Sequence, residues 1–479
     1  MTVRDFREFM ALAEQQGKLR RITKTVDPSW EPACLIKWMY QALPAEQRFG
    51  LLFDDVTGKD MPLASAALGA SADTYALALG VERDGLNNIW GRALDNQLKP
   101  QVVNEAPCQE VVRLGKDASL DILPIPIWTP GKDVAPYITT TTITQRADNA
   151  QQNMSVYRTM VRDQHSVLLN INPGRDGYIC AHTYLDRGKP APVAWVIGAE
   201  PAVYFASVAN LPSGVDEIAL AGGLKSAPIE MVKAKTLDIF VPANAEIIIE
   251  GEILPDEMAD EGPFGEFAGY MGSVSPKPVV RITAITHRRD PIYYGLASQM
   301  PPSESTTIQS LSNAPLILYR LREELGESSV TDVSIDLTFG GGLAHGIVAM
   351  RPEHPGHAKE VAQKLIEHTA LKRITMVDDF VDIRNPQQLS WALNSHYHPS
   401  RDTQIFDEAI LPLDPTAELS VAGLPKGSKI IVDATQTRDA GPTSLPTMAH
   451  MEKALETWRT AGLPDFEVPA GLRKMLERP

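Results

Sequence analysis

The sequence predicts a mixed α/β protein built from two or three domains. A chain of 479 residues is longer than a single hydrophobic core normally serves, so one domain is not expected. Short β-rich runs fill the middle of the chain, whereas helical and strand patterns alternate on either side of it. A proline-rich stretch separates the first part from the second. These observations place the expected domains at residues 1–118, 119–305 and 306–479.

The composition excludes several classes of function. A net charge of −15 argues against a general binder of nucleic acid or of anionic membranes. No run approaches the ~18 apolar residues of a membrane span, and the charged N-terminus lacks a signal-peptide pattern. Three widely spaced cysteines fit a reducing compartment and form no zinc pattern. We therefore expect a cytoplasmic protein with neither a nucleic-acid nor a membrane partner.

The first domain begins with an amphipathic helix in "MTVRDFREFMALAEQQGKLRRI". Its apolar residues fall at helical spacing and are Phe6, Phe9, Met10 and Ala13. The chain then turns at Gly17 into a strand. A second helix is expected in "LGASADTYALALG", with Ser71 or Asp73 near its start.

The central domain is expected to be rich in strands. The closely spaced prolines of 121–136 exclude a helix and a central strand, so this segment is extended, and a threonine-rich strand follows it. Further β-rich runs are "MSVYRTMV", "HSVLLNI", "PVAWVIG", "EIIIEGEI" and "VVRITAITH". Between them, "EPAVYFASVAN" and "VDEIALAGGL" have helical patterns. A barrel or a sandwich with inserted helices is the expected architecture.

The last domain has a βαβ-like rhythm. A helix at 315–326 precedes a strand at 342–350, a helix at 356–370 and a strand at 374–383. A final helix is expected at 448–462. The C-terminal domain is therefore predicted to be α/β.

The stretch 260–270, "DEGPFGEFAGY", carries two glutamates on a restricted corner. Its proline fixes one φ, and its first two glycines permit backbone conformations that other residues avoid. Such a corner can point Glu261 and Glu266 toward one place. Two close carboxylates push their pKa values apart, so that one of them can hold a proton near neutral pH. The alternative interpretation is a solvated acidic turn.

The run "NMSVYR" at 153–158 is expected to be a strand, in which alternate side chains share a face. Arg158 then shares a face with two apolar residues, and this setting favours a carboxylate partner. Glu261 and Glu266 are the candidates. The alternative is an edge-strand arginine that reaches solvent.

Glu217 stands near the start of the helix expected in "VDEIALAGGL". The pattern favours an acid that interacts with the helix dipole. The alternative is a ligand for a hard divalent cation, together with an amide oxygen such as that of Asn153. Two basic residues near glycines, Arg175 in "NPGRDG" and Arg351 in "MRPEHPGHAKEV", are weak candidates for phosphate contacts.

Together, "NMSVYR", "VDEIALAGGL", "EGPFGEFAGY" and "LPIPIWTPGKDVAPYITTTTIT" resemble the UbiD family of reversible decarboxylases. The likeness runs along most of the chain and includes "DFREFMALAEQQGKLRRI", "HPGHAK" and "VDDFVDIRNPQQLSWAL". The resemblance implies an N-terminal α/β domain, a central split-barrel-like flavin-binding domain and a C-terminal α/β domain that mediates oligomerisation. A homodimer or a homohexamer is the expected assembly.

The resemblance also implies a reaction. Family members decarboxylate aromatic, heteroaromatic or α,β-unsaturated carboxylic acids reversibly and without oxidation, through a covalent adduct of the substrate with prenylated FMN. A flavin prenyltransferase supplies that cofactor. The alternatives are an ordinary FMN-dependent oxidoreductase and a non-catalytic flavin-binding member.

Roles for single residues follow from the resemblance. Arg158, Glu261 and Glu266 match the family's catalytic network, with Glu266 as the proton donor. Asn153 and Glu217 match ligands of a cation, Mn²⁺ or Mg²⁺, which reverses the interpretation of Glu217 from pattern alone; K⁺ is a further candidate ion. The residues expected to contact the cofactor are Asn153, Val156, Tyr157, Arg158, Asn170, Ile171, Asn172, Arg175, Asp176, Glu217 and Arg351.

Two positions depart from the family's pattern. Several members have a histidine metal ligand near position 176, where this chain has Asp176. A carboxylate suits a hard ion, so Asp176 is the expected third metal ligand, and His182, six residues later, is the alternative. Arg351 stands where many members have a lysine, and the two cations differ in shape.

Overall fold

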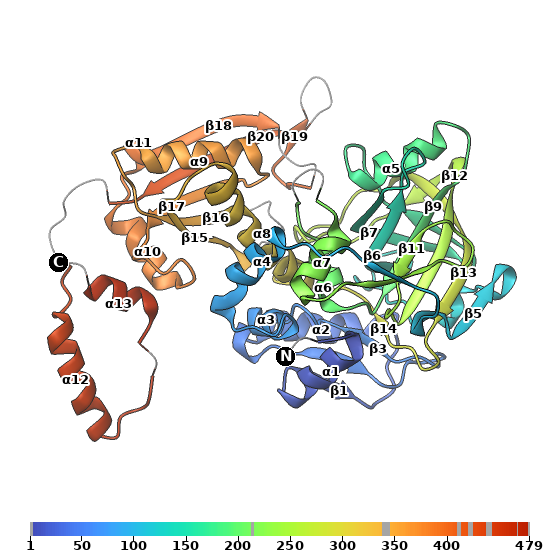
Figure 1. The fold of residues 1–479 in the computed structure, drawn as a ribbon, viewed down its shortest axis with the longest axis horizontal. Coiled ribbons are helices and arrows are strands. Elements are labelled where there is room, and N and C mark those ends of the chain that lie inside the picture. Colours follow the sequence, from blue (N-terminus) through green and yellow to red (C-terminus); the bar gives the residue numbers. More distant parts are fainter. Residues whose placement is uncertain are drawn as a thin grey trace. The chain divides into compact units, whose positions relative to one another are not determined.

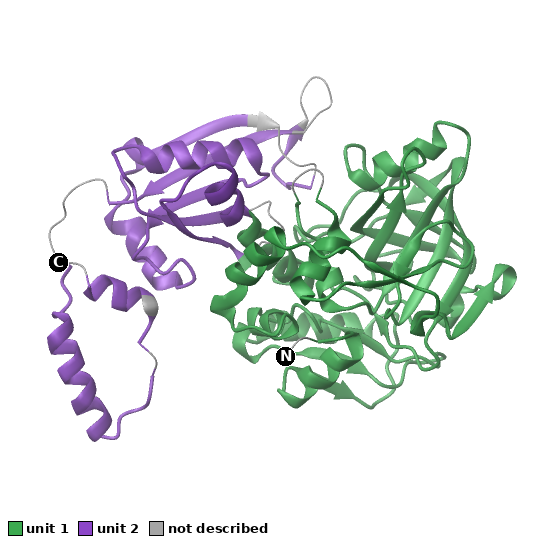
Figure 2. Ribbon diagram, in the orientation of Figure 1, with its two compact units in different colours: residues 1–316, 337–341 green, residues 317–336, 342–479 purple. Residues whose placement is uncertain are grey.

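A computed structural model gives the structure of residues 3–211, 215–337, 345–409, 413–419, 425–436, 443–466 and 468–477. The chain forms two compact units, which Figure 2 shows in different colours. Unit 1 contains residues 1–316 and 337–341, and unit 2 contains residues 317–336 and 342–479. Among the helices of these described residues, none is long and apolar enough to cross a membrane. The domain boundaries at residues 118 and 305 stay predictions.

The N-terminal part of unit 1 is a four-stranded sheet with helices beside it (Figure 1). Its strands, in spatial order, are β1 (Leu19–Ile22), β2 (Gly50–Phe53), β3 (Leu63–Ser65) and β14 (Tyr293–Tyr294). Its helices are α1 (Phe6–Gln15), α2 (Glu31–Ala42), α3 (Ala72–Ala78) and α4 (Leu86–Asp95), with 3₁₀ turns η1 (Ala45–Gln47) and η2 (Arg83–Gly85). β14 pairs with β3 in parallel, so this sheet is completed by a strand from far along the chain.

The first helix forms where the sequence predicts it. The Asp5 side chain caps α1 by accepting a hydrogen bond from the Glu8 N–H at 2.9 Å. All four residues predicted to share its apolar face are buried, namely Phe6, Phe9, Met10 and Ala13. Ser71 caps α3 in the same way.

The centre of unit 1 is a closed barrel of six strands, which decides between the barrel and the sandwich. The strands follow the order β12, β9, β6, β7, β8 and β13, and β12 also pairs with β13. Their bounds are β6 (Tyr137–Gln145), β7 (Gln152–Asp163), β8 (Ser166–Leu169), β9 (Ala191–Ile197), β12 (Ile247–Glu261) and β13 (Ser275–His287). All nine residues of the threonine-rich β6 are buried, because this strand pairs on both sides.

Smaller elements surround the barrel. β5 (Val111–Leu114) extends it beside β13, and a separate sheet contains β4 (Gln101–Val103), β10 (Glu230–Lys233) and β11 (Phe240–Pro242). The helices are α5 (Asp176–Leu185), α6 (Pro201–Ser207) and α7 (Glu217–Lys225), with 3₁₀ turns η3 (Pro107–Gln109), η4 (Gly115–Asp117) and η5 (Leu120–Ile122). The predicted strands and both inserted helices of this region are thus confirmed.

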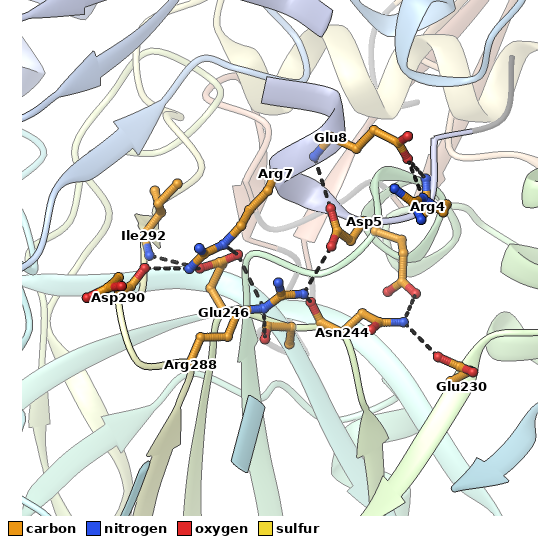
Figure 3. A network of polar contacts seen from close by, with 12 residues as sticks. Arg4, Asp5, Arg7, Glu8, Glu230, Asn244, Glu246, Arg288, Asp290 and Ile292 are labelled. Carbon is orange, nitrogen blue, oxygen red and sulfur yellow. Dashed lines mark hydrogen bonds and ion pairs between the residues drawn. The ribbon is translucent and has the colours of Figure 1, made fainter. Parts of the chain in front are cut away.

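A buried ionic network joins α1 to the barrel (Figure 3). Glu246, which directly precedes β12, is fully buried. Arg7 donates from Nε and Nη2 to the two Glu246 carboxylate oxygens at 2.8 and 2.7 Å. Arg288 lies 3.5 Å from Glu246 and 3.3 Å from Asp5. A buried carboxylate of this kind needs its cations, so the network fixes α1 on the barrel.

Unit 2 is an α/β sheet of six strands. The order is β15 (Val330–Ile335), β16 (His345–Met350), β17 (Arg373–Asp378), β20 (Pro425–Ala434) and β18 (Thr403–Ala409), and β19 (Glu418–Leu419) also pairs with β20. β16, β17 and β20 are parallel, and α9 (His357–His368) connects the first two as the predicted βαβ unit. The other helices of unit 2 are the π-helical turn η6 (Arg320–Glu324), α10 (Pro386–Ser395), α11 (Pro399–Asp402), α12 (Met448–Thr460) and α13 (Ala470–Leu476). α8 (Glu304–Tyr319) begins in unit 1 and continues into η6. Residues 342–344 of the predicted strand lie outside the described residues.

Candidate active site

Arg158 on β7 binds the carboxylate of Glu261 at the end of β12. Arg158 Nε donates to Glu261 Oε1 at 2.9 Å and Nη2 donates to Oε2 at 2.8 Å. Glu261 is fully buried, and Asn170 Nδ2 donates a third hydrogen bond to it at 3.1 Å. Bidentate pairing of this kind fixes both the position and the plane of the two groups. The arginine of this strand therefore has the carboxylate partner that its setting requires.

Glu266 contacts the same guanidinium. Its Oε1 forms an ion pair with Arg158 Nη1, so one arginine faces two carboxylates. Only 9% of Glu266 is exposed. The Arg158 guanidinium also lies over the ring of Phe264, 5.4 Å from its centroid, where a cation–π contact is favourable. Both acids are buried, so the interpretation as a solvated acidic turn is wrong.

The segment between β12 and β13 holds Glu266 in place. The Glu266 N–H donates to Tyr270 O at 2.8 Å, and the Gly272 N–H donates to Phe264 O at 2.8 Å. Gly262 has a φ of +101°, a conformation that favours glycine. A Cβ added at Gly265 would collide with Thr129 Oγ1, so a larger residue does not fit there. Gly262 thus allows the turn, and Gly265 allows this segment to approach the segment that contains Thr129.

Several residues predicted to contact the cofactor lie on the strands and segments next to Arg158 and Glu261. The Asn170 N–H donates to Arg158 O at 3.1 Å, and Lys277 Nζ donates to Asn172 Oδ1 at 2.9 Å. Tyr157 Oη accepts a hydrogen bond from the Gly177 N–H at 3.1 Å, which ties β7 to the first turn of α5. Of the remaining residues predicted to contact the cofactor, Ile171 is buried, Val156 is partly buried, and Arg175 is exposed.

Two of the three predicted metal ligands, Glu217 and Asp176, are close enough for their charges to interact. Burial raises the pKa of Glu217 to about 7, and the nearby carboxylate of Asp176 adds to the rise. The backbone of Met154, which directly follows Asn153 on β7, counters part of this rise in the pKa of Glu217. Two carboxylates and an amide are a donor set that suits a hard divalent ion. Within the described ranges, no group of three or more His, Cys, Asp or Glu residues is arranged to hold a metal.

Arg351 belongs to unit 2, where it is exposed and its Nε donates to Asp379 Oδ2 at 2.6 Å. Its contact with a phosphate stays a prediction.

A cavity of about 390 Å³ lies beside Glu266. Besides Glu266, its wall includes Lys37, Trp128, Lys132, Tyr270, Gln299 and Met300. Sequence reasoning missed Lys37 as well as Phe264 and Lys277. A lysine on an amphipathic helix or on a strand has the pattern of a solvent-facing residue. No local signal in the sequence distinguishes Lys37 or Lys277 from an ordinary surface lysine.

Models of one protein family match almost the whole chain. The UbiD models, described as the N-terminal, Rift-related and C-terminal domains of 3-octaprenyl-4-hydroxybenzoate carboxy-lyase, match residues 10–94, 101–301 and 306–434.

Solved structures give the same result. The UbiD-class enzyme HmfF from Pelotomaculum thermopropionicum in complex with FMN is 30% identical, with a TM-score of 0.82, and the match covers 94% of this chain and 99% of that one. Vanillic acid decarboxylase from Sedimentibacter hydroxybenzoicus in its closed form is 27% identical, with a TM-score of 0.83 and coverage of 96% and 99%. A 3,4-dihydroxybenzoic acid decarboxylase from Enterobacter cloacae is 25% identical, with a TM-score of 0.82 and coverage of 98% of each chain.

Proposed function

The chain belongs to the UbiD family of prenylated-FMN-dependent decarboxylases, and on this premise we propose that it decarboxylates an aromatic, heteroaromatic or α,β-unsaturated carboxylic acid reversibly and without oxidation. The observation that carries the proposal is the sharing of Arg158 between two buried carboxylates, Glu261 and Glu266. A protein that only stores a flavin has no need for such a group.

Prenylated FMN is the proposed cofactor, and a solved relative contains it. When bound, it supplies an electron sink for the carbon from which CO₂ departs. Asn153, Glu217 and Asp176 would hold Mn²⁺ or Mg²⁺ beside the flavin phosphate. The buried carboxyl of Glu217, with its raised pKa, supports this role because a divalent cation favours the carboxylate form.

The remaining contacts to the cofactor are proposed from the family resemblance. Val156, Tyr157 and Arg158 would contact the flavin from β7, and Asn170, Ile171 and Asn172 from the segment after β8. Arg175 and Arg351 would contact its phosphate. K⁺ as a second ion, a flavin prenyltransferase as the supplier of the cofactor, and assembly into a homodimer or homohexamer belong to the same proposal.

The charges of the site suggest how the proton is handled. One guanidinium faces two carboxylates, so Arg158, Glu261 and Glu266 taken alone carry a surplus negative charge unless one carboxyl takes a proton; the Lys277 ammonium interacts with Glu261 from outside this trio. Glu261 accepts three hydrogen bonds from Arg158 and Asn170, which hold it as the fixed partner of the arginine. Glu266 is then the carboxyl that holds the proton and delivers it to the substrate carbon. Arg158 orients both acids and the substrate carboxylate.

The experiment is co-expression with a flavin prenyltransferase, followed by a screen of aromatic, heteroaromatic and acrylic acids for CO₂ release. We expect release from at least one acid, and none from protein loaded with plain FMN. Oxidation of a nicotinamide donor without CO₂ release would instead indicate an FMN-dependent oxidoreductase. A bound flavin with neither activity would indicate a non-catalytic member.

A further inference from the structure

The cavity beside Glu266 contains a second group that can carry a proton. Lys37 on α2 is half-buried, and its Nζ donates to Ser298 O at 2.5 Å and to Met300 O at 3.1 Å. None of the ion pairs formed by the described residues includes Lys37. Burial lowers the pKa of Lys37 to about 7, so ammonium and amine are both present near neutral pH.

Gln299 makes this cavity a polar site. Its φ of 69° is uncommon outside glycine, and the two carbonyls that bind Lys37 belong to the residues on either side of it. Both side-chain amide atoms of Gln299 are buried and have no hydrogen-bond partner among the described residues. A cavity of about 390 Å³ has room for several water molecules, and the amide provides partners for them. A hydrogen-bonded water path between Lys37 and Glu266 therefore fits the cavity.

We propose that Lys37 returns a proton to Glu266 after each turnover, through water in this cavity. The inference rests on the proposed function, in which Glu266 delivers one proton per reaction. The bond between the substrate carbon and its carboxylate breaks, CO₂ leaves, and a C–H bond forms with the proton from Glu266. The Glu266 carboxylate then takes a proton that originates from the Lys37 ammonium, and the Lys37 amine takes one from solvent. One solvent proton is consumed for each CO₂ released, and carboxylation reverses every step.

Other titratable groups also line the cavity. They are Cys34 on α2, Lys132 in the segment before β6, and Tyr270 in the segment after β12. Lys132 and Tyr270 are exposed, so solvent screens them. The Cys34 thiol carries no positive charge in either protonation state. Among these groups, Lys37 is therefore the one whose lowered pKa lets it exchange a proton near neutral pH.

Turnover of the prenylated-FMN holoenzyme tests the relay. In weakly buffered solution at pH 7, Lys37→Met should lower steady-state turnover by at least ~10-fold, because reprotonation of Glu266 becomes slow. The rate of a single turnover should stay near that of the wild type, because Glu266 is already protonated when the substrate binds. Added imidazole or methylamine should raise the steady-state rate of Lys37→Met and leave the wild type unchanged. Lys116→Met is the matched control, because Lys116 is exposed and is not one of the residues that line the cavity.

Two results would overturn the relay. One is wild-type steady-state turnover by Lys37→Met, and the other is a loss that appears equally in a single turnover and does not respond to added amine. If the wild-type holoenzyme releases no CO₂ from any acid, the proposed function itself has failed. A second measurement tests Lys37 independently of turnover. The protein without cofactor is treated with acetic anhydride over a range of pH, and mass spectrometry measures how much of Lys37 is acetylated. We expect half-maximal reactivity near pH 7 for Lys37 and at much higher pH for Lys116; equal titration of the two would contradict the proposal.

Discussion

Arg158 Nε and Nη2 hold the two oxygens of Glu261 at 2.9 and 2.8 Å, although the two residues are 103 positions apart in the chain. Each belongs to a different strand of the closed barrel, so the pairing depends on the barrel being complete. Since Arg158 also contacts Glu266, the position of the proposed proton donor depends on this pair.

Arg158→Lys should lower kcat/KM by at least ~10²-fold, because a lysine presents a point charge and cannot bind Glu261 through two parallel hydrogen bonds. Removing the cation altogether in Arg158→Met should also destabilise unit 1 by about 3–5 kcal/mol, since a buried carboxylate loses its partner. Decarboxylation kinetics and urea unfolding measure the two effects. Wild-type kinetics for Arg158→Lys would show that the bidentate geometry is not used.

Glu266→Gln should keep the flavin and lose turnover by at least ~10²-fold, the usual scale for a positioned general acid. The flavin absorbance spectrum checks cofactor content, and CO₂ release checks turnover. Glu257→Gln is the matched control, because Glu257 lies on β12 but is exposed. Normal decarboxylation by Glu266→Gln would exclude Glu266 as the proton donor.

Glu217→Ala should purify with little flavin and little manganese, as a nearly colourless protein, because it removes a carboxylate of the proposed cation site. Metal analysis and the visible spectrum measure both losses. Asp216→Asn controls for effects on the helix, since Asp216 caps α7 through the N–H groups of Ile218 and Ala219 and an asparagine can do the same. Full metal content in Glu217→Ala would contradict the assignment.

His345 should make the stability of unit 2 depend on pH. Burial, together with the nearby Arg373, lowers the pKa of His345 to about 4, whereas an unfolded chain has a histidine pKa near 6.5. Between these values the unfolded state binds more protons, so stability is complete above pH 6.5 and is lost as pH falls toward 4, by about 3 kcal/mol for this group. Urea unfolding followed by tryptophan fluorescence over this range measures the loss. His345→Asn should lose this part of the pH dependence; an unchanged slope would show that His345 does not cause it.

Arg7→Met should destabilise unit 1 by about 3 kcal/mol or more, because Glu246 is fully buried and loses two hydrogen bonds. Arg4→Met is the control, since Arg4 is largely exposed and pairs only locally with Glu8. The double variant Arg7→Met/Glu246→Gln separates two causes. If it is as stable as the wild type, the loss of stability in Arg7→Met comes from the uncompensated charge of Glu246. Additive losses would assign it to packing instead.

Local patterns predicted the elements of this fold well because each pattern is a property of neighbouring residues. The burial of Phe6 and Phe9, the Ser71 cap and the strand that carries Arg158 all follow from such patterns. The arrangement of elements could not be predicted in this way. The addition of β14 to the N-terminal sheet joins segments more than 200 residues apart.

The same distinction between local patterns and long-range arrangement applies to the candidate site. Residue spacing offered Glu261 and Glu266 as partners for Arg158, and family resemblance gave each a role. Neither could indicate Lys37 or Lys277, whose neighbours are brought to them by the fold. The pairing of β12 with β13 shifts register between Glu250 and Gly251 and between Ile253 and Met258. A glycine and a proline in this run indicate an irregular strand, but they do not say which residues of β13 lie opposite.

The pairing of Glu261 with Ser275 encloses residues 262–274 between two strands whose ladder is already complete. Substitutions at Tyr270 or Met271, which line the cavity and are not buried, can alter its wall while the glycines, Phe264 and Glu266 keep the turn and the barrel keeps its register. Mutation can therefore explore new substrates there at little risk to folding, so that specificity and stability become separate traits under selection.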